Sequence, residues 1–204
     1  MKEMLKNAAI LLGITVVAGF LLGLVYANTK DIIAQREYDE KVESYNEVFA
    51  DADSFEEVMD FMTEDVRNDL DGAGFESEDI DELNIAKDAS GNTLGYVMTL
   101  TTHEGYGGDI QFTLGVCLDG TVNSISILDT SESPGLGLEA DKVLKPQFEN
   151  KCVESFTYTK TGSTSDSEID AISGATITTN AVVNGVDCGL YYFNNYLKGG
   201  ADNE

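Results

Sequence analysis

The stretch IQFTLGVCLDGTV, residues 110–122, decides the fold class. From Ile110 onward, apolar residues stand at every second position, which is the period of a β-strand with one buried face. Asp119 and Gly120 follow, and an Asp-Gly pair between two apolar runs is a strong signal for a hairpin turn. Val122 opens the next apolar run. The stretch therefore predicts two neighbouring antiparallel strands.

The residues around this hairpin extend the predicted sheet. Residues 83–87 and 94–102 are two more strand-like runs, joined by the polar turn at 89–92. After the hairpin, the apolar positions of residues 122–127 change phase by one residue, which indicates a β-bulge. Together these runs predict an antiparallel meander of about four strands.

Helical patterns precede the meander. Apolar residues recur at helical spacing through residues 31–49, which predicts a helical stalk. Ser54, with Glu57 three residues later, has the pattern of a capping box that opens a second amphipathic helix. The glycine-rich turn at 71–74 would end this helix.

Helical patterns also follow the meander. Residues 140–150 predict a short helix, 156–160 a further strand and 161–167 a polar loop. Residues 178–198 carry a long apolar stripe that predicts a final amphipathic helix. The predicted class is therefore α+β, with helices packed on an antiparallel sheet.

The amino-terminal segment predicts a membrane anchor. Residues 8–27, AAILLGITVVAGFLLGLVYA, carry no charge, and twenty helical residues span about 30 Å, the thickness of the bilayer's hydrocarbon core. A signal peptide has a shorter apolar region, although residues 25–27 resemble a cleavage site, so a cleaved signal is the alternative. Lys2 and Lys6 precede the span. This placement predicts a single-pass protein of the cell membrane, with a cytoplasmic amino terminus and an extracytoplasmic domain.

The chain divides into five predicted segments. They are a cytoplasmic head (1–7), a transmembrane helix (8–27), a helical stalk and linker (28–82), a compact domain (83–198) and a flexible tail (199–204).

Composition narrows the function classes. The chain has 12 basic and 37 acidic residues and a net charge of −25, which excludes nucleic acid as a partner because like charges repel. Cys117, Cys152 and Cys188 form no C-x-x-C pair, and His103 is the single histidine. These spacings argue against a metal or iron–sulfur site held by this chain alone. One disulfide between two of the three cysteines stays open.

Three glycine-containing loops are candidates for a ligand pocket: residues 105–109, 133–137 and 173–176. Each alone is typical of a turn, but glycine also lets the backbone approach a ligand closely. The third loop opens the final helix, and a helix amino terminus favours a phosphate. There the hydroxyl of Thr176 can cap the helix or accept a phosphoryl group, and general helix statistics favour the cap.

The run Asp-Ala-Ile-Ser-Gly-Ala-Thr, residues 170–176, resembles the flavinylation signature of FMN-binding domains. In that family a flavin transferase uses FAD to attach FMN to the hydroxyl of the final threonine, which is Thr176 here. Residues 105–109 resemble the family's glycine-tyrosine motif, and residues 132–137 resemble its E-T-P-G-L-G loop. Ser133 replaces the usual threonine, and Thr130 stands where a histidine is often found. The missing histidine puts any proton or flavin contact of that position in doubt.

The resemblance implies covalent FMN as the cofactor, with Thr176 as its phosphoryl ester and no metal. The implied cofactor-binding residues are Asp170, Ser173, Gly174, Ala175, Thr176, Tyr106, Gly107, Gly108, Glu132, Ser133, Gly135, Leu136 and Gly137. Tyr106 is expected to stack on or border the ring, with a structural role as the equal alternative. For Asp109 and Glu132, solvated charges are favoured over ring contacts.

Size and layout most resemble the G subunits of the Rnf complex, an ion-translocating ferredoxin:NAD oxidoreductase. The resemblance implies an electron relay through FMN, with the other membrane subunits of that complex as partners and no stand-alone catalysis. One alternative is the C-type subunit of the sodium-pumping NADH:quinone reductase. Others are an independent extracytoplasmic flavin carrier and a flavin-free anchored binding module.

Overall fold

The computed structural model describes residues 1–199 and divides the chain into two compact units, Met1–Lys41 and Val42–Glu204. The first unit is the greater part of helix α1 (Lys2–Val48). By length and composition α1 is long and apolar enough to cross a membrane, and its apolar stretch is not buried inside the structure. This agrees with the predicted anchor. Most of the predicted tail, residues 200–204, lies outside the described residues.

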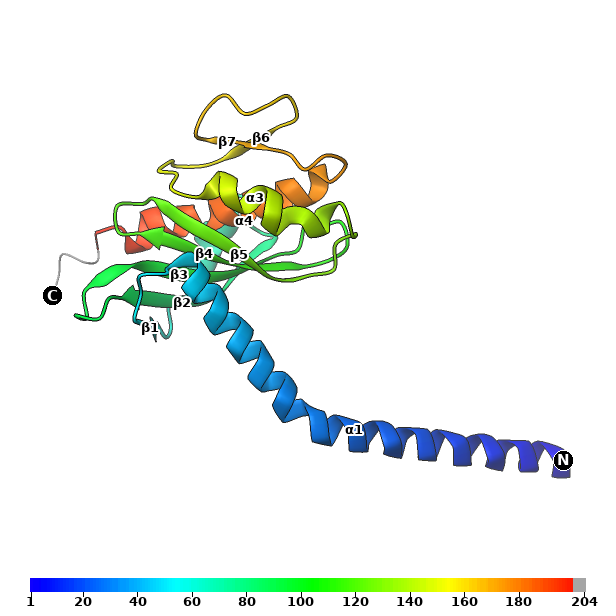
Figure 1. Ribbon diagram of the computed structural model, residues 1–204. Coiled ribbons are helices and arrows are strands. Elements are labelled where there is room, and N and C mark those ends of the chain that lie inside the picture. The colour runs from blue at the N-terminus through cyan, green and yellow to red at the C-terminus, as the bar shows by residue number, and fades with distance from the viewer. Residues whose placement is uncertain (200–204) are drawn as a thin grey trace. The chain divides into compact units, whose positions relative to one another are not determined.

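The second unit is built on one antiparallel sheet (Figure 1). Its strands are β1 (Ser54–Glu57), β2 (Glu78–Lys87), β3 (Thr93–Thr102), β4 (Ile110–Cys117) and β5 (Val122–Thr130), paired in sequence order. The predicted meander is thus confirmed, and β1 adds one edge strand. Gly120 takes a φ of +93° in the β4–β5 turn, and the pairing shifts register between Gly115 and Val116. That shift is the predicted bulge.

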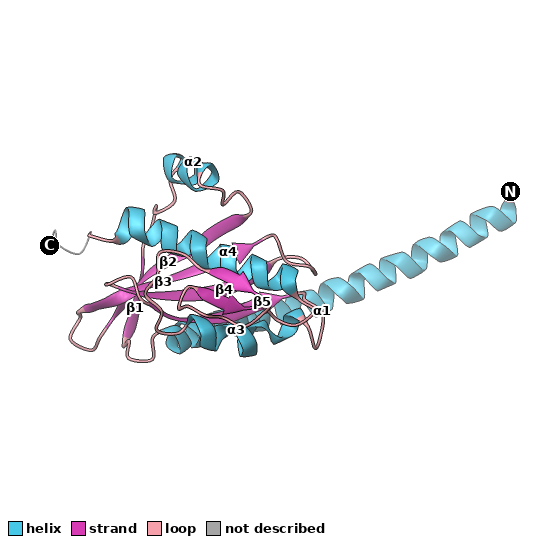
Figure 2. Ribbon diagram, turned by 90° about the horizontal axis from the view of Figure 1, so that it is seen from above, coloured by secondary structure: helices cyan, strands magenta, loops and turns pink. Residues whose placement is uncertain are grey.

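Helix α4 (Thr176–Tyr192) covers one face of the sheet and continues as a π-helical turn, Phe193–Leu197 (Figure 2). A Cβ added at Gly185 would clash with the ring of Phe112, and one at Gly189 with Leu114. These two glycines therefore let the helix lie closer to the strands than larger residues would allow. The predicted final helix is confirmed, and it begins two residues earlier than expected.

The end of α1 covers the opposite face. Tyr45, Val48 and Phe49 are buried there against Ala86 and Val97 of the sheet. The hydroxyl of Tyr45 donates to Glu82 Oε2 at 2.9 Å, so a polar bond also ties the helix end to β2. The second unit is therefore layered, with helix on both faces of one sheet.

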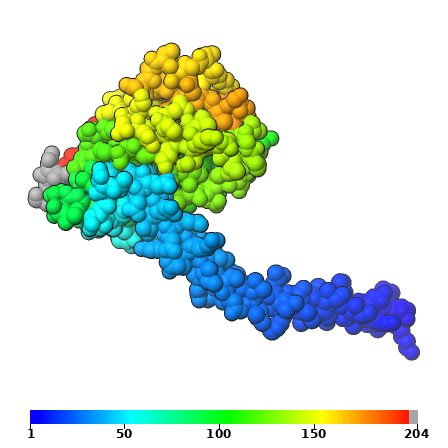
Figure 3. All heavy atoms as spheres, in the orientation of Figure 1, coloured from blue at the N-terminus to red at the C-terminus, as the bar shows by residue number. Residues whose placement is uncertain are grey.

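The remaining elements lie beside this core. They are α2 (Glu64–Gly72), α3 (Ala140–Phe148), which follows the short 3-10 turn Gly137–Glu139, and the parallel pair β6 (Thr157–Thr159) and β7 (Glu168–Asp170). Figure 3 shows the segment after α3, coloured yellow to orange, gathered at one end of the unit. The short helix and β6 were predicted. Strand β7 was not, because its sequence Glu-Ile-Asp holds a single apolar residue and so shows no alternation.

The capping box at Ser54 was wrong. Residues Ser54–Glu57 form β1 and pair with β2, with Ser54 opposite Lys87. The helix begins later, at Glu64, where the hydroxyl of Thr63 accepts from the N–H of Val66 at 3.3 Å. The free edge of β2 offers backbone hydrogen bonds that a local sequence pattern cannot reveal. The segment predicted as stalk and linker thus contributes β1, α2 and the start of β2 to the compact unit.

Candidate functional site

A tight turn leads from β7 into α4. The N–H of Ala175 donates to the carbonyl of Ile172 at 3.0 Å, and Gly174 has a φ of +80°. Glycine adopts such a left-handed conformation without steric cost. The turn exposes Ser173 and Gly174 and makes Thr176 the first helical residue.

Thr176 does not cap the helix. The N-cap position belongs to Ala175, which makes no side-chain capping bond. The first intrahelical bond runs from the N–H of Thr179 to the carbonyl of Ala175 at 3.0 Å. The N–H groups of the first helical turn therefore have no acceptor within α4, and this end of the helix favours an anion.

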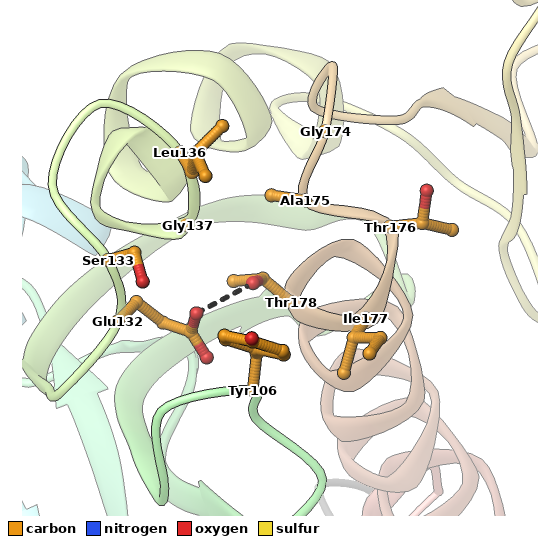
Figure 4. Close-up of a pocket in the computed structure, with 10 residues that line it drawn as sticks. All are labelled: Tyr106, Glu132, Ser133, Leu136, Gly137, Gly174, Ala175, Thr176, Ile177 and Thr178. Carbon is orange, nitrogen blue, oxygen red and sulfur yellow. Dashed lines mark hydrogen bonds between the residues drawn. The ribbon is translucent and has the colours of Figure 1, made fainter.

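A cleft of about 440 Å³ opens beside this helix start (Figure 4). It is lined by Tyr106, Glu132, Ser133, Leu136, Gly137, Gly174, Ala175, Thr176, Ile177 and Thr178. All three glycine-containing loops contribute to it, as the sequence suggested. Its volume falls within the range of roughly 300–1,000 Å³ that is usual for small-molecule sites.

Apolar side chains stand exposed around the cleft. Tyr106 is 70% exposed, Ile177 53% and Leu136 41%. Large apolar side chains exposed around one concave site are typical of a binding surface. A flat apolar ring fits such a rim, and a phosphate fits the helix start beside it. The lining thus suits a ligand with a ring and a phosphate.

Glu132 lies on the inner wall of the cleft and is only 6% exposed. Its carboxylate accepts from the hydroxyl of Thr178 at 2.9 Å and from the N–H of Gly107 at 3.1 Å (Figure 4 shows the first bond). A Cβ added at Gly137 would clash with both Glu132 and Thr178. The expectation of a solvated charge at Glu132 is therefore wrong, because tertiary hydrogen bonds replace its water.

His103 lies directly after β3 and holds the base of the loop that carries Tyr106. Its Nδ1 lies 2.8 Å from Asp109 and its Nε2 3.0 Å from Asp79. Hydrogen bonds to these carboxylates, first to Asp109, raise the pKa of His103 to about 8. Asp109 is exposed, as expected, but it is paired with this histidine.

Some predicted residues do not line the cleft: Asp170, Ser173, Gly107, Gly108 and Gly135. Gly107 supports it through the bond to Glu132, and Asp170 lies in β7, before the turn. Ile177 and Thr178 line the cleft and were missed. Both follow Thr176 within the first turn of α4, so the helix that was predicted close by could have pointed to them.

Among residues 1–199, no group of three or more potential metal-ligating side chains is found.

Thr130 ends β5, and its hydroxyl accepts from the N–H of Glu132 at 3.3 Å. Cys117, Cys152 and Cys188 are free thiols.

Comparison with known proteins gives two family matches. Residues 105–190 match the FMN-binding domain, and residues 1–48 match the RnfG N-terminal region.

Two relatives match over nearly their whole length. The chain is 32% identical to the G subunit of the Na(+)-translocating ferredoxin:NAD(+) oxidoreductase complex of Acetobacterium woodii, over 97% of this chain and 95% of that protein. It is 30% identical to the G subunit of the ion-translocating oxidoreductase complex of Methanosarcina acetivorans, over 94% and 95%. The crystal structure of Shewanella oneidensis NqrC aligns with a TM-score of 0.47 and 19% identity, over 55% of this chain and 57% of that chain.

Proposed function

Because this chain belongs to the family of G subunits of Rnf-type ion-translocating oxidoreductase complexes and has their FMN-binding domain, we propose that it relays electrons through an FMN esterified to Thr176. The single observation that carries the proposal is the cleft at the start of α4. There a threonine hydroxyl, a helix amino terminus and an apolar rim meet.

The choice of Thr176 rests on a comparison of the hydroxyl groups around the turn. Thr178 is 1% exposed and donates to Glu132. Thr179 is fully buried, donates to the carbonyl of Ala175 and accepts from the N–H of Ile172. Ser173 is exposed but does not line the cleft. Of these four, Thr176 alone is partly exposed, lines the cleft and has a hydroxyl with no hydrogen bond to any residue in the range 1–199.

The proposed attachment is a phosphoryl transfer made by a flavin transferase with FAD as donor. A bond forms between Oγ1 of Thr176 and the phosphorus of the FMN half. The phosphoanhydride bond to AMP breaks, AMP leaves, and the hydroxyl proton passes to a base of the transferase. The negative phosphodiester then lies at the positive end of α4, which stabilises it.

The protein's own residues would hold and shield the ring. Tyr106, Leu136 and Ile177 offer apolar contacts around the cleft, which favours burial of the ring faces from water. Bound FMN supplies reversible electron uptake, and the surrounding charges and hydrogen bonds set its potential. A covalent tether keeps the cofactor at high local concentration outside the cell, where a dissociable flavin would be lost.

Intact-mass measurement of the protein made together with a flavin transferase tests the attachment. The wild-type chain is expected to gain one FMN that survives denaturation. Thr176→Val keeps the shape of the side chain without its hydroxyl and is expected to gain nothing, whereas Thr176→Ser is expected to retain acceptance. Thr161→Val, at an exposed threonine outside the three glycine-containing loops, is the matched control and keeps the flavin. FMN on the Thr176→Val protein would place the ester elsewhere.

We also propose that the domain after α1 faces the outside of the cell and docks with the other membrane subunits of the complex. Cys152 is exposed in this domain, whereas Cys188 is buried, so Cys152 can report the side. A membrane-impermeant maleimide is expected to label intact cells or spheroplasts, and Cys152→Ser to remove most of the label. Labelling only after lysis would place the domain in the cytoplasm. Purification from mild detergent is expected to bring redox subunits with it.

A further inference from the structure

The side chain of Gln147, on α3, binds the backbone of Asp170. The N–H of Asp170 donates to Gln147 Oε1 at 2.7 Å, and Gln147 Nε2 donates to the carbonyl of Asp170 at 3.2 Å. The same Nε2 donates to the carbonyl of Val143 at 2.8 Å. The amide group therefore has one orientation that satisfies all three bonds.

This pair occupies the second edge of β7. On its first edge, β7 pairs with β6, and the N–H of Ala171 donates to the carbonyl of Thr159 at 2.8 Å. Gln147 supplies one donor and one acceptor on the other side, as a neighbouring strand would. The backbone of Asp170 is thus bound by Gln147 on one edge, and that of the next residue, Ala171, by Thr159 on the other.

The side chain of Asp170 explains why its backbone needs these hydrogen bonds. Its Oδ1 is buried and has no hydrogen-bond partner within the described residues. An unsatisfied buried oxygen costs free energy, so without other restraints the segment would turn it toward water. The bonds from Gln147 and Thr159 oppose that movement.

The backbone between Asp170 and Thr176 has little conformational freedom. The N–H of Ile172 donates to Oγ1 of Thr179 at 3.1 Å, and the turn that follows closes between Ile172 and Ala175. Ile172 and Ala175 are buried, and only Ser173 and Gly174 between them are exposed. A displacement of Asp170 would therefore be carried to the start of α4.

We propose that Gln147 is a positioning residue for flavin attachment, holding the run from Asp170 to Thr176 so that the Thr176 hydroxyl is presented to the flavin transferase. This inference rests on the proposed function. Gln147 lies outside all three glycine-containing loops and does not line the cleft. It acts through the backbone of Asp170 rather than on the flavin.

The test is the rate of FMN incorporation into the full chain, in detergent, by a purified transferase with FAD. Gln147→Met keeps the length of the side chain and removes the bonds to Asp170. The kcat for the chain as substrate is expected to fall by about 10- to 100-fold, because a misplaced reacting group slows a step by this order. The KM for the chain and the Tm are expected to change little. Hydrogen exchange at the Asp170 amide is expected to become faster, which reports the lost contact directly.

Gln111→Met is the matched control. Gln111 is also a half-buried glutamine with side-chain hydrogen bonds, but its partners are Asp81 and Thr101 on the sheet. It should incorporate FMN at the wild-type rate. If Gln147→Met does not fold, Gln147→Glu replaces it, since the carboxylate keeps the acceptor and removes only the donor; the same fall in kcat is expected.

Two outcomes overturn the inference. One is a wild-type rate in a folded Gln147→Met protein, and the other is a change confined to KM, which would make Gln147 a docking contact. A wild-type chain that accepts no FMN would instead contradict the proposed function itself.

Discussion

A buried carboxylate ties the parts of the cleft together. Glu132 receives bonds from Gly107, in the first loop, and from Thr178, on α4. Gly137 packs against both Glu132 and Thr178 with no room for a Cβ. The carboxylate of Glu132 thus lies in a closely packed part of the cleft wall. A small increase in side-chain volume there would displace one of its hydrogen bonds.

Gly137→Ala is expected to destabilise the protein by about 1–3 kcal/mol, because the added methyl overpacks this junction. Chemical denaturation would measure the loss. The control is Gly72→Ala in α2, where nothing lies within 4 Å of an added Cβ. There the better helix propensity of alanine is expected to leave stability unchanged or to raise it by up to about 1 kcal/mol. Equal effects at both positions would argue against tight packing at Gly137.

His103 is expected to titrate with a pKa near 8, measured by NMR on its ring protons. Its two carboxylate neighbours favour the charged form, so its contribution to stability is complete below about pH 6.5 and is lost as the pH rises through 8. Asp109→Asn is expected to lower the pKa. Salt is expected to lower it as well, because the side chain is 44% exposed. An unchanged pKa in Asp109→Asn would show that the contact is absent in solution.

At the scale of elements, α4 serves two purposes. Its first turn forms part of the cleft, and its body packs closely on the sheet through Gly185 and Gly189. Farther along, Asp187 accepts from the N–H of Phe156 at 2.8 Å and so fixes the segment leading into β6. The strand β6 pairs with β7, whose last residue leads the turn to Thr176. Through Asp187, helix α4 therefore helps to position β6 and β7, and so the turn that leads to its own first residue.

The link through Asp187 predicts a pH effect. Burial raises the pKa of Asp187 to about 7, so the folded state favours its protonated form. Its contribution to stability is complete below about pH 4 and is lost as the pH rises through 7. Asp187→Asn keeps the acceptor for Phe156 and is expected to exceed the wild-type stability at pH 8 by on the order of 1 kcal/mol. Denaturation at pH 5 and 8 measures this, and a constant difference would contradict it.

At the scale of the whole molecule, the boundary between the units falls inside α1. The helix continues past Lys41, and its last residues are buried on the sheet. The apolar segment that can span a membrane and the residues that pack on the sheet therefore lie in the same helix. Only the end of that helix belongs to the domain's core. Truncation can separate the two roles.

A fragment of residues 42–204 is expected to fold, remain soluble and accept FMN. A fragment of residues 50–204 lacks Tyr45, Val48 and Phe49, which are at most 6% exposed. Each buried apolar side chain of this size stabilises a fold by roughly 1.5–3 kcal/mol. Their joint loss is a large part of the stability of about 5–15 kcal/mol of a typical domain. Thermal melts of the two fragments measure the difference, and equal Tm values would contradict the role of the α1 end.

The sequence alone determined the features that a local pattern encodes. Alternation through residues 110–118 and the pair Asp119-Gly120 predicted strands β4 and β5. The uncharged run 8–27 predicted a helix able to span a membrane. The run 170–176 pointed to FMN through its likeness to a known signature, and the matched FMN-binding domain agrees. Such signals depend on residues close together in the chain. Their periodicity or chemistry can be recognised without knowing which distant residues they contact in the fold.

Tertiary structure alone decided the features that depend on distant partners. Ser54–Glu57 became a strand rather than a helix start because the edge of β2 offered backbone bonds. Glu132 became buried because Gly107 and Thr178 satisfy its carboxylate. The hydroxyl of Thr176 does not cap α4, because the preceding turn places Ala175 at the N-cap position and Thr176 one residue inside the helix. In each case the deciding free energy comes from pairing and desolvation across the fold, which no local window of sequence contains.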